Sequence, residues 1–113
     1  MLRRTLERAG FDVVTATHGV TALTLFRDIP IDLVVTDIVL PQMDGFELMR
    51  RLKYDAPDVP IIAISGMDDS PQFREQALAC GAASALTKPI SRQQLVDLAK
   101  SMTGPNLQKA AAP

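Results

Sequence analysis

The chain has 113 residues, a formal net charge of −1 and 47% hydrophobic residues, which indicates one globular domain and excludes a wholly disordered chain. The near-neutral charge argues against a nucleic-acid-binding protein that relies on bulk positive charge, and 4% aromatic residues argue against stacking on single-stranded bases. One cysteine excludes an internal disulfide. No apolar run approaches the ~20 residues that span a bilayer.

The first residues are basic, but they predict a helix and not a targeting peptide. Glu7 follows closely, and neither an apolar segment nor a small-residue cleavage site precedes Gly10. The lack of an export signal and the single cysteine lead us to expect a cytoplasmic protein.

The first half of the chain alternates between helical and extended patterns. Leu2, Leu6 and Ala9 lie on one face of a short helix that Gly10 can end. A β-branched stretch follows, then a helix, then an apolar strand that runs into Asp37. The sequence here predicts helices over residues 2–9 and 20–27 and strands over residues 11–16 and 31–36.

The second half repeats the pattern, with clearer helix boundaries. Asp44 and Glu47 form a capping box, Ser70 precedes a proline at the first helical position, and Ser91 begins a further capping box. Gly81 can end the helix that starts after Ser70. The sequence predicts helices over residues 44–54, 71–80 and 91–103, strands over residues 60–64 and 84–87, and a tail of low structural content over residues 104–113.

Strands that alternate with helices through short connections favour right-handed βα units and a parallel sheet. Ligands of such sheets bind beyond the carboxyl ends of the strands. The strand before Asp37, the strand that ends at Ser65 and the strand that leads into Lys88 would bring a carboxylate, a hydroxyl and an ammonium to one edge. A carboxylate can accept a phosphoryl group as an aspartyl phosphate, while the hydroxyl and the ammonium stabilise its charge.

Each of these residues also has a purely structural explanation. An aspartate after a strand is usually a turn or cap residue, Ser65 alone would be a loop hydroxyl, and Lys88 alone a solvated surface charge. The functional hypothesis rests on their joint position at three strand ends.

These segments resemble the receiver domain of two-component response regulators. The resemblance is carried by residues 37–45 (DIVLPQMDG), 61–66 (IIAISG) and 81–89 (GAASALTKP), and it covers residues 1 to about 103. It implies a flavodoxin-like, doubly wound α/β fold. We therefore divide the chain into a receiver domain over residues 1–103 and a C-terminal tail over residues 104–113.

The resemblance also implies a role for individual residues. Asp37 matches the aspartate that accepts a phosphoryl group from a phosphohistidine, Ser65 the hydroxyl that moves toward that group, and Lys88 the lysine that pairs with it. Asp37 and the backbone carbonyl of Val39 would contact Mg²⁺. The partners implied are a histidine kinase or phosphotransfer protein and a downstream protein that contacts the last two helices; no nucleic acid and no membrane is expected.

The chain departs from the family at its start. Members of the family begin with a strand that ends in two acidic residues, whereas this chain begins with a helix. We therefore expect an N-terminally truncated sheet of four strands instead of five, with a gap second from the edge. Backbone groups beside the gap would lose partners at a cost of ~1–3 kcal/mol each if buried. We expect strand 11–16 to pair with strand 31–36, to become mobile, or to borrow a strand from another chain in a dimer.

The missing acids and one further departure bear on function. Mg²⁺ prefers several oxygen ligands, so weak Mg²⁺ binding and slow phosphorylation are expected. Ala85 stands where the family usually has an aromatic residue that reports phosphorylation to partners.

Three functions are consistent with these residues. The leading hypothesis is a non-enzymatic receiver module that accepts a phosphoryl group on Asp37 in a phosphorelay, impaired by the missing acids. The alternative is a phosphorylation-independent pseudo-receiver that acts as a protein–protein interaction domain. An enzyme that uses Asp37 and Lys88 in a pocket is less well supported, because no general-base histidine or glycine-rich loop accompanies them.

Overall fold

The computed structural model describes residues 2–15, 19–28, 30–37, 45–65, 71–87, 89–103 and 109–112. Strands and helices alternate from α1 (Leu2–Arg8) to β5 (Lys109–Ala112). The described strands form one parallel sheet in the order β1-β5-β2-β3-β4. The edge strand β1 (Asp12–Thr15) lies next to β5. On the other side of β5 follow β2 (Leu33–Asp37), β3 (Ile61–Ser65) and β4 (Ser84–Thr87).

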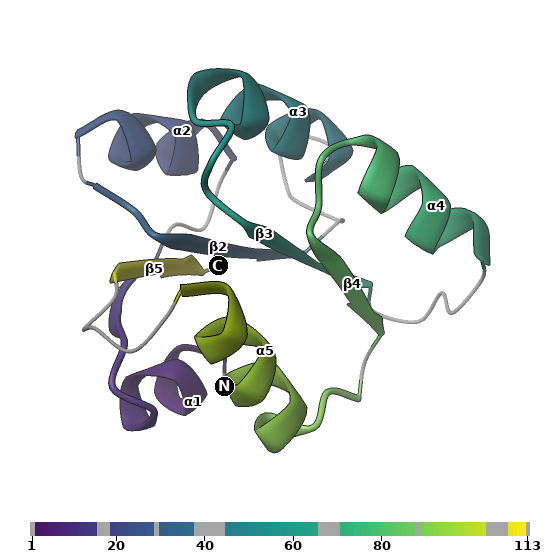
Figure 1. The fold of residues 1–113 in the computed structure, drawn as a ribbon. Helices are drawn as coiled ribbons and strands as arrows, with labels where there is room; N and C mark the ends of the chain where they lie inside the picture. Colours follow the sequence, from purple (N-terminus) through teal and green to yellow (C-terminus); the bar gives the residue numbers. More distant parts are fainter. Residues whose placement is uncertain are drawn as a thin grey trace.

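Helices cover both faces of this sheet (Figure 1). One face carries α2 (Gly19–Asp28), α3 (Gly45–Asp55) and α4 (Pro71–Ala79), and the opposite face carries α1 and α5 (Arg92–Thr103). This is the flavodoxin-like, doubly wound α/β architecture that the sequence predicts. No helix in the described part of the chain combines the length and the apolar character that crossing a membrane requires.

The core is divided by the sheet into two layers. Because side chains alternate along a strand, Val34, Ile61 and Ala63 pack against α2, α3 and α4, while Val35, Ile62 and Ile64 belong to the layer beneath α1 and α5. Every residue of β3 is buried. A strand covered on both faces is apolar throughout, which explains why its sequence shows no alternation.

Three predicted helix ends are confirmed. Gly10 follows α1 with a φ of 100°, and Gly81 follows α4 with a φ of 106°. In both places the next amide closes the end: Phe11 N donates to Leu6 O, and Ala82 N donates to Ala77 O, each at 3.0 Å. At the start of α5, Gln94 N donates to Ser91 Oγ at 3.3 Å. The predicted cap at Asp44 lies outside the described residues.

The expectation of four strands is wrong, and so is the expectation that the whole tail has little structure. The described sheet has five strands, and the tail residues of β5 lie between β1 and β2. They pair in parallel with β1 from Asp12↔Lys109 to Thr15↔Ala112, and with β2 at Leu33↔Ala110 and Val34↔Ala111. The chain's own tail therefore occupies the position second from the edge that the sequence predicts to be empty.

The physical reason lies in the backbone. Buried N–H and C=O groups of neighbouring strands require partners, and an extended segment supplies them whatever its side chains. Lysine and alanine are depleted in strands, so the composition of β5 gave no sign of this pairing. Within the described residues, β1 therefore neither pairs directly with β2 nor needs a strand from a second chain.

Candidate functional site

The carboxyl ends of β2 and β3 bring Asp37 and Ser65 to the same edge of the sheet. Asp37 is the last residue of β2 and Ser65 the last residue of β3. The register pairs Asp37 with Ile64, so Ser65 lies one residue beyond Asp37 on the neighbouring strand. Adjacent strands are about 4.8 Å apart, which puts the two polar residues within reach of one small ligand.

β4 contributes to the same edge. Its last residue, Thr87, pairs with Ser65. Thr87 immediately precedes Lys88 in the chain, but Lys88 itself lies outside the described residues, as does Val39. Of the predicted set, the structure thus places Asp37 and Ser65 at the same edge of the sheet.

The surroundings of Asp37 change from core to solvent within one residue. Residues 33–36 of β2 are buried, and Asp37 is partly exposed. The hydroxyl of the preceding Thr36 is buried and donates from Oγ1 to the carbonyl oxygen of Asp37 at 3.0 Å. Ser65 is buried at 7% exposure. Because its carboxylate is partly exposed, Asp37 can be reached by a large molecule. A group bound to Asp37 and Ser65 would be partly shielded from water, because Ser65 is buried.

Thr36 was not singled out from the sequence, because a threonine within an apolar strand is ordinary β-branched composition. Its buried hydroxyl donates a hydrogen bond to the backbone carbonyl oxygen of Asp37, where β2 ends, and is thereby satisfied. No sequence signal distinguishes this threonine from one that only packs.

The described residues do not fit a magnesium site. Residues 109–112, which occupy the place of the family's first strand, are lysine and three alanines and contain no carboxylate. β5 ends opposite Thr15 on β1, and Asp12 is at the amino end of β1, away from this edge. Among the described residues, no group of three or more His, Cys, Asp or Glu side chains could hold a metal ion.

Ala85 lies within β4 and is buried at 8% exposure in the core layer beneath α2, α3 and α4. It pairs with Ala63 on β3. A methyl group has no rotamers, so this position cannot report a change at the sheet edge through side-chain rotation.

Comparisons with known proteins agree with this geometry. The family model described as "Response regulator receiver domain" matches residues 1–100. A probable transcriptional regulatory protein of Picosynechococcus is 38% identical over 98 residues, which cover 80% of this chain and 39% of that protein. The sensor protein EvgS of Escherichia coli is 38% identical over 91 residues, covering 80% of this chain and 8% of that protein. The chain thus spans less than half the length of these relatives.

Solved structures show the same fold. A putative response regulator from Chloroflexus aurantiacus superposes with a TM-score of 0.85 at 28% identity, covering 91% of this chain and 85% of that one. A CheY-like receiver domain protein from Methanospirillum hungatei gives a TM-score of 0.82 at 26% identity, covering 88% of this chain and 79% of that one.

Proposed function

Because the chain belongs to the response regulator receiver domain family, we propose that it accepts a phosphoryl group on Asp37 from a histidine kinase or a phosphotransfer protein in a phosphorelay. Receiver domains are phosphoacceptor modules of two-component signalling, are generally non-enzymatic, and generally bind Mg²⁺ at an acidic site. The observation that carries the proposal is the position of Asp37, partly exposed at the carboxyl end of β2 and next to Ser65.

In the proposed reaction, a carboxylate oxygen of Asp37 attacks the phosphorus of a phosphohistidine. A P–O bond forms, the P–N bond breaks, and the imidazole leaves with its electron pair. The product is a mixed anhydride between the carboxyl group and phosphate. The hydroxyl of Ser65 donates to a phosphoryl oxygen, and the ammonium group of Lys88 offsets the added negative charge.

The proposal includes an impaired reaction. The family's acidic pair has no counterpart in β5, whose described residues are lysine and alanine. Asp37 and the Val39 carbonyl would be left as protein ligands for Mg²⁺, which favours several oxygen ligands. We expect weak Mg²⁺ binding and slow phosphorylation, because two anions meet with less compensating positive charge.

A second candidate function is supported by two observations. The alanines of β5 and the buried Ala85 suit a domain that keeps the fold and acts through protein contacts without phosphorylation. The intact pair of Asp37 and Ser65 favours the first function.

The remaining parts of the proposal concern location and partners. A downstream protein would contact α4, β4 and α5 of the receiver domain of residues 1–103, whose sheet is completed by β5 from the tail of residues 104–113. A cytoplasmic location fits the single cysteine. Because β5 of the same chain already fills the sheet, a dimer that completes the sheet would form by exchange of β5 between two copies.

The two functions are separated by intact-mass measurement after incubation with a small phosphodonor and Mg²⁺. The first function predicts a gain of one phosphoryl group that disappears in Asp37→Asn. The matched control is Asp58→Asn, an exposed aspartate in the segment before β3, at the opposite edge of the sheet, and it should be phosphorylated like the unmodified protein. No gain in mass in the unmodified chain supports the second function.

A further inference from the structure

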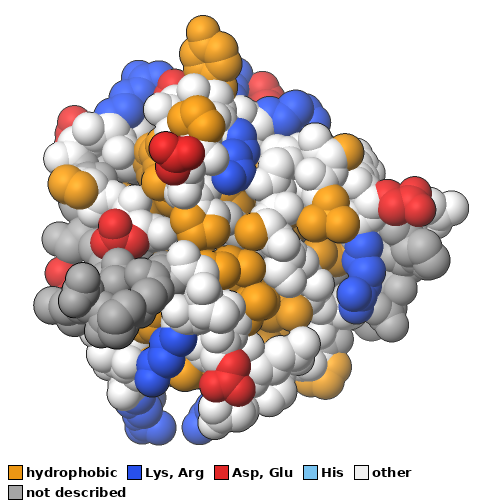
Figure 2. All heavy atoms as spheres, viewed as in Figure 1, with side chains coloured by type: hydrophobic (Ala, Val, Ile, Leu, Met, Phe, Trp, Pro, Cys, Tyr) orange, Lys and Arg blue, Asp and Glu red, His pale blue; other side chains and the backbone are white. Residues whose placement is uncertain are grey.

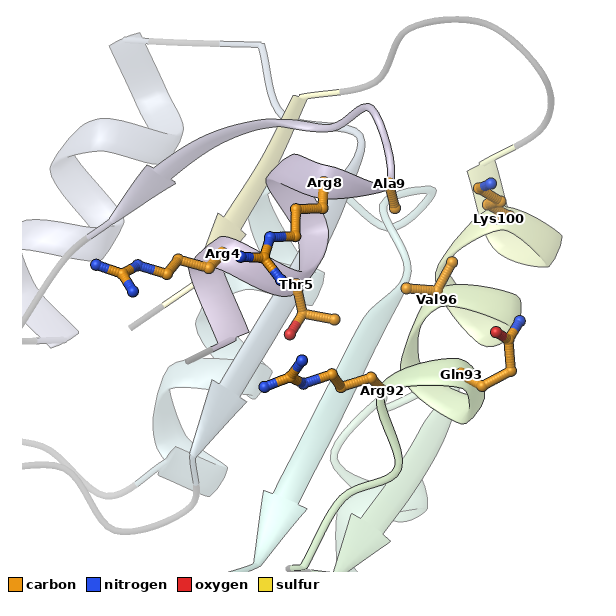
Figure 3. Close-up of a pocket in the computed structure, with 8 residues that line it drawn as sticks. All are labelled: Arg4, Thr5, Arg8, Ala9, Arg92, Gln93, Val96 and Lys100. Atoms are coloured by element: carbon orange, nitrogen blue, oxygen red, sulfur yellow. The ribbon is translucent and has the colours of Figure 1, made fainter.

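A basic groove lies between α1 and α5, and neither Asp37 nor Ser65 is among the residues that line it. A cavity of about 590 Å³ separates the two helices, lined on one side by Arg4, Arg8 and Ala9 and on the other by Arg92, Val96 and Lys100 (Figure 3). In this view Arg92 extends from α5 toward α1, and the Val96 methyl groups face the gap. Figure 2 shows basic side chains at the lower edge of the same face, over α1 and α5.

The charge of this groove is uncompensated. Among the residues that the structure describes, none of its four cationic side chains takes part in an ion pair or hydrogen bond, whereas Arg27 and Arg51 on the opposite helical face are paired with Asp55 and Glu47. No carboxylate is among the described residues that line the groove. Asp97, also on α5, accepts a hydrogen bond from Gln93 Nε2 at 2.7 Å.

A chain of net charge −1 therefore gathers four positive charges at one place. Like charges that share a groove repel one another and create a local positive potential. An anion that contacts both walls removes this repulsion, and an anion with several charges does so best.

The side chains indicate which anion fits. Three of the four cations are arginines, whose planar guanidinium groups bind phosphate oxygens in pairs. The volume falls within the range of roughly 300–1,000 Å³ of small-molecule sites. The described lining residues include no aromatic side chain, and the apolar ones among them are Ala9 and Val96. These residues thus offer neither a platform for a nucleobase nor the large apolar anchor pockets of protein interfaces.

We propose that this groove binds a small molecule through an oligophosphate chain, with Arg8 and Arg92 contacting it from opposite walls. The phosphate chain is the recognised group, whether it is inorganic or part of a nucleoside triphosphate. The binding does not involve the sheet edge at Asp37.

The test is calorimetric titration of the full chain with inorganic tripolyphosphate, in the presence of a chelator and at low salt. We expect saturable binding at one site. The double variant Arg8→Gln, Arg92→Gln should bind at least about tenfold more weakly, because it loses charge-assisted hydrogen bonds from both walls. The matched control is Arg27→Gln, Arg51→Gln, which changes the net charge equally on the α2–α3 face and should stay within about twofold of the unmodified chain.

Further titrations distinguish an inorganic oligophosphate from a nucleoside triphosphate, and both of these from an acidic peptide. Equal affinity for tripolyphosphate and ATP shows that the phosphate chain alone is bound, and tighter binding of ATP shows that the nucleoside adds contacts; both support the proposal. Asp37→Asn should bind as the unmodified chain does, so the result is independent of phosphorylation. The proposal is overturned by absent saturable binding, by equal weakening in the control, or by tighter binding of a poly-glutamate peptide through the same arginines.

Discussion

Asp37 is more exposed to solvent than Ser65, and this difference in exposure suits their proposed roles. The partly exposed carboxylate at the end of β2 can be reached by a donor protein, whereas the buried hydroxyl of Ser65 can only serve a group that has already arrived. The register between β2 and β3 fixes the two residues next to each other through backbone pairing. In the proposed function, this backbone pairing would hold both residues at the same edge before the donor binds, so little ordering would be needed in the reaction.

Ser65→Ala should slow phosphorylation of Asp37 while leaving the fold intact. The variant removes one hydrogen bond to a charged phosphoryl oxygen, worth about 1.5–3 kcal/mol, and the rate should fall roughly tenfold to a hundredfold. The rate of mass increase with a small phosphodonor measures it. Ser84→Ala, at the amino end of β4, is the control and should react at the normal rate. Equal rates for both variants would remove Ser65 from the site.

Gly10 and Gly81 offer a matched pair for stability, because both have a positive φ near 100°. A Cβ at Gly10 would meet nothing within 4 Å, whereas a Cβ at Gly81 would collide with the stem of Lys53. That stem is held in place, since Lys53 Nζ donates to Pro57 O at 3.1 Å and to Val59 O at 2.9 Å.

Gly10→Ala should therefore cost about 1 kcal/mol in the free energy of unfolding, from backbone strain alone. Gly81→Ala should cost about 1–3 kcal/mol more, from the steric conflict with Lys53. Urea denaturation measures both values. In a Lys53→Ala background the two glycine substitutions should cost nearly the same; a persisting difference would show that Lys53 is not its source.

At the scale of elements, β5 is the feature that sequence patterns do not predict. Gly10, Gly81 and Ser91 mark helix ends through local chemistry, and a continuous apolar run identifies β3, so these elements follow from neighbouring residues. The pairing of β5 with β1 and β2 joins residues at opposite ends of the chain. This pairing arises because the backbone groups of β1 and β2 require hydrogen-bond partners, and the side chains of Lys109–Ala112 do not indicate a strand.

Removal of residues 109–113 should destabilise the whole sheet. The backbone groups of β1 and β2 that face β5 would lose partners at ~1–3 kcal/mol each, a loss comparable to a total stability of ~5–15 kcal/mol. We expect a lower urea midpoint and faster amide hydrogen exchange in β1 and β2. Lys109→Ala, which leaves the backbone intact, should retain the stability of the full chain. An unchanged midpoint in the truncated chain would show that β5 contributes little.

At the scale of the whole molecule, the C-terminal tail completes the sheet but brings no carboxylate to it. The tail restores a five-stranded parallel sheet with helices on both faces (Figure 1). Its lysine and alanines add no carboxylate beside Asp37. The sequence predicts the fold family and the position of Asp37 and Ser65 at the ends of two neighbouring strands, because these depend on local patterns. Their roles and weak metal binding stay predictions. The sequence does not predict which segment lies between β1 and β2, because that position is filled by pairing between distant parts of the chain.

The most direct test of the central claim locates the phosphoryl group on the chain. After incubation with a phosphodonor, borohydride reduces an aspartyl phosphate to homoserine, and peptide mass spectrometry then identifies the modified residue. The account predicts homoserine at position 37 and an unmodified peptide in Asp37→Asn. Homoserine at any other aspartate, with position 37 unchanged, would contradict it.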